Sequence, residues 1–254
     1  MDAETEKAIQ YSQKLLNAAI DVVGAARVTL NENWARDPKI VGLTILCRSI
    51  SNFRAAVRLV QQEQVQEARV LVRLLYENML WMAALRERGS DFVKDMIDDE
   101  GFNRRALAEL TMKLTHKHGG DVDAPESLKL RSIIMDLDKK FPSMKKLQAS
   151  KTTAEGVVEI AYVEYVRFSL DGVHCSVTAL GKHLVRESAK GNVEITVSVI
   201  PRTSDEETKS TILHACRALT GAAVGANELV GFAAASTMLG TLVTEYESNG
   251  WQRS

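Results

Sequence analysis

The stretch that decides the fold lies at residues 154–183 and reads AEGVVEIAYVEYVRFSLDGVHCSVTALGKH. Successive residues of a helix are separated by about 100°, and at that spacing the apolar side chains of this stretch cover the whole circumference. A helix that is apolar on every side is a buried one. The pattern therefore predicts one long buried helix over 154–183.

Four ionisable residues interrupt this apolar surface along one side, at spacings i, i+3, i+7 and i+10: Glu164, Arg167, Asp171 and His174. Charged side chains rarely occupy a protein interior unless they are paired or used in function. This stripe is the strongest indication of a functional site in the sequence.

The helix expected at about 65–88 has the same pattern. Its apolar residues cover most of the circumference, and three charged residues form a narrow stripe: Arg69, Arg73 and Glu77. Arg73 and Glu77 stand at i and i+4, where they can pair. The packing that leaves the fewest charges unpaired sets the two stripes against each other. Glu77 would then face Arg167, and Arg73 would face Glu164 or Asp171.

Two interpretations of these stripes stay open. One is a buried ion-pair network that fixes the register of the helices. The other is a polar pocket between helices, the usual place for a site in a helical bundle. Tyr165 and Ser169 would add hydroxyl groups to such a pocket, and His174 is of a residue type that titrates near neutral pH.

The rest of the chain also favours long helices. Asp37-Pro38 indicates a helix start and Arg88-Gly89 a helix end. We expect helices over 5–33, 38–62, 65–88, 91–118, 127–147 with an interruption at Pro142, and 205–248, with a polar connector at 151–155. NVEITVSVIP at 192–201 predicts either an edge strand or one arm of a hairpin.

The expected fold is therefore an all-α up-down bundle of about six to eight helices with one short β-like segment. We expect a single domain over 1–254, and an exposed N-terminal helix over 1–35 stays open. The small-residue C-terminal helix and the apolar side of the first helix suggest a homodimer.

The overall charge gives the chain no bulk attraction to nucleic acid or to a membrane, because 32 Lys and Arg balance 33 Asp and Glu. Its 3 cysteines are widely spaced and form no disulfide framework. Residues 221–243 imitate a membrane span, but Asn227 and Glu228 lie inside it. A buried helix whose small residues let a neighbour approach explains that segment better. We expect a cytoplasmic protein that makes no membrane contact and needs no metal or cofactor.

Arg167 and His174, separated by six residues, resemble the R-x4–6-H motif of the HEPN superfamily of all-α domains, which includes metal-independent ribonucleases of toxin–antitoxin and antiphage systems. The resemblance implies that His174 acts as general acid or base on a ribose 2′-OH and that Arg167 holds the phosphate. Glu77 or Arg73 would assist. The residue after the arginine is usually polar in active members, whereas here it is Phe168.

A closer resemblance covers about residues 38–176. The third helix carries the pattern A-x-x-L-x-R-x-L-x-E, and a second pattern, Y-x3-S-x4-H-x-S, follows much later: Ala68, Leu71, Arg73, Leu75 and Glu77, then Tyr165, Ser169, His174 and Ser176. Both patterns are similar to those of domain-of-unknown-function family 5677, a prokaryotic group. This resemblance implies an all-α fold and carries no activity.

Three functions follow as hypotheses. The first is a HEPN-like ribonuclease or toxin with an RNA substrate and an antitoxin or defence partner. Its catalytic residues would be His174, Arg167 and Glu77, and its substrate-binding residues Arg73, Arg69, Tyr165, Ser169, Asp171 and Glu164. The second is a small-molecule or nucleotide sensor that uses the same pocket without turnover. The third is a helical interaction protein in which the charged stripes are architecture.

Overall fold

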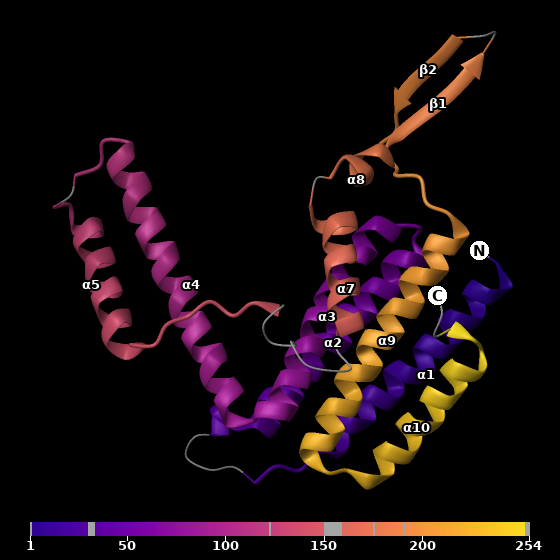
Figure 1. The fold of residues 1–254 in the computed structure, drawn as a ribbon, viewed down its shortest axis with the longest axis horizontal. Helices are drawn as coiled ribbons and strands as arrows, with labels where there is room; N and C mark the ends of the chain where they lie inside the picture. Colours follow the sequence, from indigo (N-terminus) through magenta and orange to yellow (C-terminus); the bar gives the residue numbers. More distant parts are fainter. Residues whose placement is uncertain are drawn as a thin grey trace.

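A computed structural model describes residues 2–29, 34–121, 123–149, 159–174, 176–189 and 192–251. These residues form an all-α protein with one small hairpin, which confirms the predicted fold class (Figure 1). The helices are α1 (Ala3–Ala25), α2 (Pro38–Gln61), α3 (Val65–Arg88), α4 (Ser90–Lys117), α5 (Pro125–Lys140), α7 (Glu159–Phe168), α8 (Val177–Gly181), α9 (Asp205–Val230) and α10 (Ala233–Ser248). The hairpin pairs β1 (Leu184–Ala189) with β2 (Asn192–Val197) in antiparallel register.

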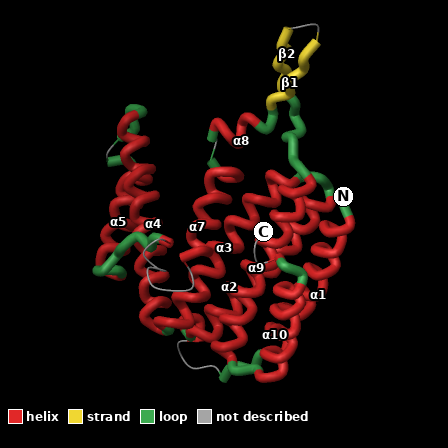
Figure 2. Tube along the Cα trace, turned by 45° about the vertical axis from the view of Figure 1, so that its right-hand side comes forward, coloured by secondary structure: helices red, strands yellow, loops and turns green. Residues whose placement is uncertain are grey.

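The body of the molecule is a bundle of α1, α2, α3 and α9, with α7 and α10 packed on its outside (Figure 2). Its core contains large apolar side chains from all four inner helices, among them Leu15, Phe53, Leu75 and Leu219. Because burial of such side chains is the dominant favourable contribution to folding, these four helices form the rigid frame to which the other elements attach.

Close packing of α9 on α3 depends on two small residues. A Cβ added at Gly221 would lie 2.7 Å from Cγ of Met79, and one added at Gly225 would lie 2.6 Å from Cγ of Met82. The small residues of 221–243 therefore admit a neighbouring helix, as expected. The segment is not one continuous helix, however, because Gly231 adopts a left-handed conformation with φ 73° and separates α9 from α10. The prediction of a single helix over 205–248 is wrong at this point.

The first helix is shorter than predicted and is not exposed. It ends at Ala25 rather than at residue 33, and Ala8, Tyr11 and Leu15 are fully buried against the bundle. The expectation of an exposed N-terminal helix over 1–35 is corrected accordingly. The starts and ends of α2 and α3 are confirmed, including Asp37 as the N-cap that accepts the Lys39 amide and Pro38 in the first turn.

Helices α4 and α5 form a two-helix arm that projects from the bundle (Figure 1). The fifth helix ends at Lys140, and the residues up to Leu147 that we expected to be helical are not. The residue before a proline is disfavoured in the α conformation, so Pro142 terminates the helix at Phe141 instead of interrupting it.

The stretch 154–183 is not one buried helix. Among its described residues, Glu159–Phe168 is regular α-helix, Ser169–Val173 is a π-helical turn, and a new short helix begins at Val177. Several of its apolar residues face solvent, with Ile160 70% and Val177 88% exposed. Residues 151–158, which include the expected connector, lie outside the described residues. The partner of the predicted strand is β1, which begins at Leu184, directly after the stretch expected to be one long helix.

Within the described residues, one helix, α2, is long and apolar enough to cross a membrane. Core helices of water-soluble proteins have the same length and composition, so this observation is weak evidence.

Candidate functional site

The two charged stripes meet, as predicted, where α7 and the π-helical turn pack against α3. Arg69 Nη2 lies 2.5 Å from Asp171 Oδ2, and Arg73 Nη2 donates to the Tyr165 hydroxyl at 2.5 Å. The geometry therefore brings together residues that stand about a hundred positions apart in the sequence. The exact pairing is different from the prediction and is described next.

Arg73 pairs within its own helix rather than with Glu164 or Asp171. Its Nη1 donates to Glu77 Oε2 at 2.8 Å, and its Nε donates to the Ser169 hydroxyl at 3.4 Å. Glu77 is thus used by Arg73, and the predicted contact with Arg167 is wrong. The half-buried Arg73 group joins α3 to α7 through hydroxyl groups instead of a second carboxylate.

Arg69 is the most buried cation of the site, with 3% of its side chain exposed. Its guanidinium lies over the ring of Phe168 at 4.6 Å and donates to the Thr211 hydroxyl at 3.4 Å. Phe168 is fully buried and stacks on Tyr76. The apolar residue that departs from the HEPN pattern is therefore the aromatic anchor that fastens α7 to α3 and α9.

Gly172 explains why the turn approaches α3 so closely. A Cβ at this position would lie 3.2 Å from the Val70 amide nitrogen and 3.4 Å from the Arg69 carbonyl carbon. The π-helical turn, closed by the His174 amide donating to the Ser169 carbonyl at 3.0 Å, places this glycine against the α3 backbone. The turn thereby points Asp171 at Arg69 and ends the helix before His174.

His174 does not join the site. Its side chain is exposed beyond the π-helical turn, and among the residues that the structure describes it makes no hydrogen bond or ion pair with Arg167, Arg73 or Glu77. Arg167 is 52% exposed and lies 3.4 Å from Glu164 on its own helix. Glu77 pairs with Arg73 and Arg167 pairs with Glu164, so within the described residues no hydrogen bond or ion pair joins the three predicted catalytic residues to one another.

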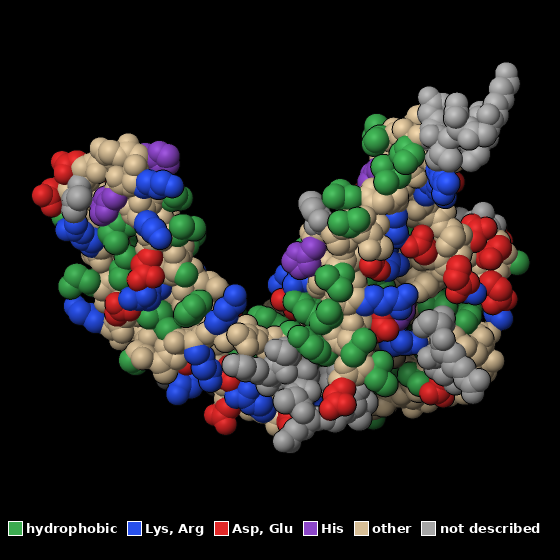
Figure 3. Space-filling view, turned by 45° about the horizontal axis from the view of Figure 1, so that its top comes forward, with side chains coloured by type: hydrophobic (Ala, Val, Ile, Leu, Met, Phe, Trp, Pro, Cys, Tyr) green, Lys and Arg blue, Asp and Glu red, His purple; other side chains and the backbone are tan. Residues whose placement is uncertain are grey.

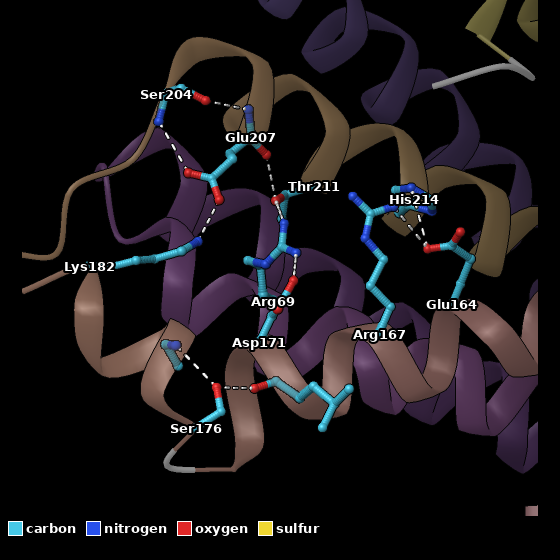
Figure 4. A network of polar contacts seen from close by, with 12 residues as sticks. Arg69, Glu164, Arg167, Asp171, Ser176, Lys182, Ser204, Glu207, Thr211 and His214 are labelled. Carbon is cyan, nitrogen blue, oxygen red and sulfur yellow. Dashed lines mark hydrogen bonds and ion pairs between the residues drawn. The ribbon is translucent and has the colours of Figure 1, made fainter.

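Another histidine, His214, occupies the interior. His214 of α9 is buried, and its Nδ1 lies 2.7 Å from the Tyr76 hydroxyl. Its Nε2 lies 3.8 Å from Glu164 Oε2 (Figure 4). Burial, reinforced by the positive charges of Arg217, Arg167 and Arg69, lowers the pKa of His214 to about 3. The ring is therefore neutral at physiological pH.

The proton positions of this group follow from its surroundings. Burial raises the pKa of the Tyr76 phenol, so the phenol keeps its proton and can donate it to His214 Nδ1. The ring proton then sits on Nε2, on the side of Glu164. Within the described part of the chain Nε2 has no hydrogen-bond partner. We call these three side chains, Tyr76, His214 and Glu164, the buried triad.

The sequence signal for His214 is weak, because its neighbours at helical spacing are the mixed set Ser210, Thr211, Arg217 and Ala218. Nothing in the spacing along the chain connects it to Tyr76 or Glu164. The contact depends on how α9 packs between α3 and α7, which local patterns do not specify.

A cavity of about 390 Å³ opens beside the buried triad. It is lined by residues of α3, α7 and α9: Tyr76, Met79, Ile160, Ala161, Glu164, Arg217 and Gly221. Glu164 and Arg217 bring charges of opposite sign to walls that are otherwise mostly apolar. Its volume lies within the range of about 300–1,000 Å³ that is typical of small-molecule sites. We call it the Glu164 cavity.

A second set of polar contacts holds the end of the site in place. Lys182 pairs with Glu207, which also closes a capping box with Ser204 at the start of α9 (Figure 4). Burial opposes ionisation of Glu207, but the hydrogen bond and charge of Lys182 outweigh it and lower the pKa of that carboxyl. The ion pair attaches the segment after α8 to α9.

The described residues contain no cluster of three or more His, Cys, Asp or Glu side chains that would hold a metal ion. The groups of the site that could act chemically are its arginines, carboxylates, hydroxyls and one neutral imidazole.

Fold and site together define the class of this protein as an all-α bundle with a polar cluster between α3 and α7. The chain belongs to the family described as Family of unknown function (DUF5677), whose model matches residues 39–192. This match confirms the resemblance inferred from the third helix and the Tyr165–Ser176 pattern. No curated protein and no solved structure matches the chain.

Proposed function

We propose that this protein is a sensor that binds a small organic molecule in the Glu164 cavity without turning it over. The observation that carries the proposal is a cavity of about 390 Å³ whose polar wall is backed by the buried triad. Two members of this triad, Tyr76 and His214, have pKa values perturbed by burial, and such groups cluster at functional sites.

The lining of the cavity suggests the chemistry of the ligand. Met79, Ile160 and Ala161 offer an apolar surface for a flat or aliphatic body. The Glu164 carboxylate is an acceptor and the Arg217 guanidinium a donor. A nucleobase or a similar heterocycle, with an apolar ring face and both donors and acceptors on its edge, matches this pattern.

The buried triad would couple the binding of such a ligand to a movement of α7. Glu164 pairs with Arg167 on its solvent side, and it faces the His214 ring on its interior side. A donor from the ligand would compete for the same carboxylate oxygen. Binding would then move Glu164 between its solvent-side partner and its interior partner, and would shift α7 relative to α9. These two positions of Glu164 and α7 make a two-state element, which is suited to a sensor.

The experiment is a thermal-shift screen of the intact chain against nucleobases, nucleosides and nucleotides. A ligand present at about 100 times its Kd stabilises the folded state by about 2.7 kcal/mol, or roughly 5–10 °C for a chain of this size. Ile160→Trp fills the mouth of the cavity at an exposed position and should remove the shift without lowering the Tm of the free protein.

Val163→Trp is the matched control, because Val163 is an equally apolar, 62% exposed residue of α7 that does not line the cavity. It should leave the ligand shift intact. The proposal fails if a ligand shift survives Ile160→Trp as well as it survives Val163→Trp, or if no compound of these classes shifts the wild-type protein.

A second candidate function is metal-independent RNA cleavage by His174 and Arg167, with Glu77 in support and with an antitoxin or defence partner. One observation favours it: both side chains are accessible to a large substrate, because Arg167 is half exposed and His174 is exposed. Cleavage should proceed in the presence of a metal chelator and leave 2′,3′-cyclic phosphate ends.

His174→Ala should abolish that cleavage, while His118→Ala, an exposed histidine of the α4–α5 arm, should not. Equal activity in both variants, or no cleavage by the wild-type chain, removes the nuclease proposal. If no ligand binds and no RNA is cleaved, the third hypothesis remains. In it the charged stripes only hold the helices of an interaction protein together.

A further inference from the structure

The segment from α7 to Ile200, just beyond the hairpin, exposes many large apolar side chains to solvent. Eleven large apolar side chains along it are between 45% and 94% exposed. They are Ile160, Val163, Leu170, Val173, Val177, Leu180, Leu184, Ile195, Val197, Val199 and Ile200. We call this surface the hairpin face.

Strand register places three of these apolar residues on one side of the hairpin, together with Arg186. Leu184 pairs with Val197, and Arg186 pairs with Ile195, so these cross-strand partners share one side of the hairpin. An isolated two-stranded hairpin is marginally stable in water. A hairpin that projects from the bundle with such residues exposed is built to pack against another surface.

A second apolar surface lies on the projecting arm. Leu107, Leu110 and Leu114 of α4 stand at i, i+3 and i+7 and are 66%, 53% and 46% exposed, so they form one stripe of the helix. Leu128 and Met135 of α5 are seven residues apart, on one side of that helix, and are also exposed. We call these five residues the arm face.

The arm does not hang freely from the bundle. Asp95 near the base of α4 pairs with Arg88 of α3 at 2.5 Å and with Lys145 of the segment after α5 at 2.5 Å. The Ser143 hydroxyl donates to Asp98 at 3.0 Å. Both ends of the arm are therefore fixed near one point, and the arm face is held at a defined place.

The arm and the bundle with its hairpin flank an open hollow (Figure 3). Figure 3 shows the arm on one side and the bundle with the hairpin on the other, and hydrophobic side chains gather on both walls of the space between them. Neither wall covers the other within one chain, because the hollow between them is open in that view.

We propose that the occupant of this hollow is a second copy of the chain, in a two-fold dimer that places the arm face of each copy against the hairpin face of the other. A two-fold axis repeats the contact twice, so both apolar surfaces of both copies are covered in one closed assembly. A different protein would have to match two separate walls at once.

The area available is what a stable dimer needs. A fully exposed Val or Leu side chain offers roughly 60–120 Å² of apolar surface. The eleven residues of the hairpin face and the five of the arm face, on average about 63% exposed, then offer on the order of 600–1,200 Å² from each copy. A standard interface buries about 800 Å² from each partner. The net charge of −1 adds no long-range repulsion between copies.

The inference does not rest on the ligand proposal, and its test is the mass of the intact chain in solution by size-exclusion chromatography with light scattering. At tens of micromolar the wild-type protein should have twice the 28.0 kDa mass of one chain. Leu110→Lys on the arm face and Val197→Glu on the hairpin face should each give a monomer with unchanged helical circular dichroism. Both positions are exposed within the single chain.

Mixing the two variants is the decisive step. In the mixed dimer one contact joins the new lysine to the new glutamate and the other is fully wild-type, so mixing should restore the dimer mass. Ile133→Glu is the matched control, because Ile133 is exposed but lies about 140° around α5 from Leu128; it should remain a dimer.

A monomeric wild-type chain overturns the proposal. So does a loss of the dimer in only one of the two variants, or a mixture that stays monomeric, since both results indicate arm-to-arm or hairpin-to-hairpin contact instead.

Discussion

Removing the Asp171 carboxylate should destabilise the protein more than removing its partner Arg69, and the reason is the unequal burial of the two groups. Arg69 is 3% exposed and Asp171 is 25% exposed. Asp171→Asn leaves a guanidinium without its counter-charge in the interior, whereas Arg69→Met leaves a carboxylate that water can reach. Breaking a buried ion pair on one side costs about 3–5 kcal/mol.

The expected magnitudes follow from the contacts. Asp171→Asn should lower the free energy of unfolding by about 3 kcal/mol, at the low end because Arg69 keeps Thr211 and the Phe168 ring as neighbours. Arg69→Met loses the contact with the ring but adds no unpaired buried charge, so about 1–2 kcal/mol is expected. The double variant should resemble Arg69→Met, since the unpaired charge is gone.

Urea unfolding followed by far-ultraviolet circular dichroism, at one fixed protein concentration, measures these differences. Arg167→Met is the control: its pair with Glu164 is long and half exposed, and it should cost less than about 1 kcal/mol. An Asp171→Asn variant as stable as Arg69→Met, or a double variant with the sum of both losses, would refute the account of Arg69 as a buried charge held by Asp171.

The remaining predictions concern the turn and the buried histidine. Gly172→Ala should cost about 1–3 kcal/mol, because its Cβ would press on the α3 backbone at Val70. Gly240→Ala in α10, where a Cβ meets nothing within 4 Å, should instead stabilise the protein by about 0.5–1 kcal/mol, and equal effects of the two would contradict the packing argument. The stability from His214 should be complete above its unfolded pKa of 6.5 and decrease as pH falls toward its folded pKa of about 3, because in that range only the unfolded chain binds the extra proton. Between pH 6.5 and 5 the wild-type protein should therefore lose about 1.1 kcal/mol of unfolding free energy per pH unit more than His214→Gln, with the slope approaching about 1.4 kcal/mol per unit at the acid end. Parallel pH profiles would show that the ring is not held neutral.

The charged stripes were predictable because they obey local rules. Helical spacing placed Arg69, Arg73 and Glu77 on one side of α3, and i, i+4 geometry predicted the Arg73–Glu77 pair that the structure contains. The caps at Asp37 and Gly89 are likewise local, which is why the bounds of α2 and α3 could be read from the sequence.

The predicted pairing across the helices was wrong because it depends on the exact path of α7. A straight helix through 154–183 would have kept His174 in line with Arg167. The π-helical turn at Ser169–Val173 inserts a different hydrogen-bond step, closed from His174 to Ser169. That step depends on a contact between Gly172 and α3, which no spacing within the stretch itself reveals.

What the sequence by itself determined is the all-α class, the family and the presence of two charged helices that face each other. These follow from periodicity and short patterns, in which each residue acts on neighbours within a turn or two. Only the tertiary structure decided that His214, not His174, enters the interior, that Phe168 is an anchor, and that the arm and the bundle with its hairpin flank an open hollow (Figure 3). Those outcomes depend on which helices pack together and at what depth, and burial of that kind is a property of the whole chain.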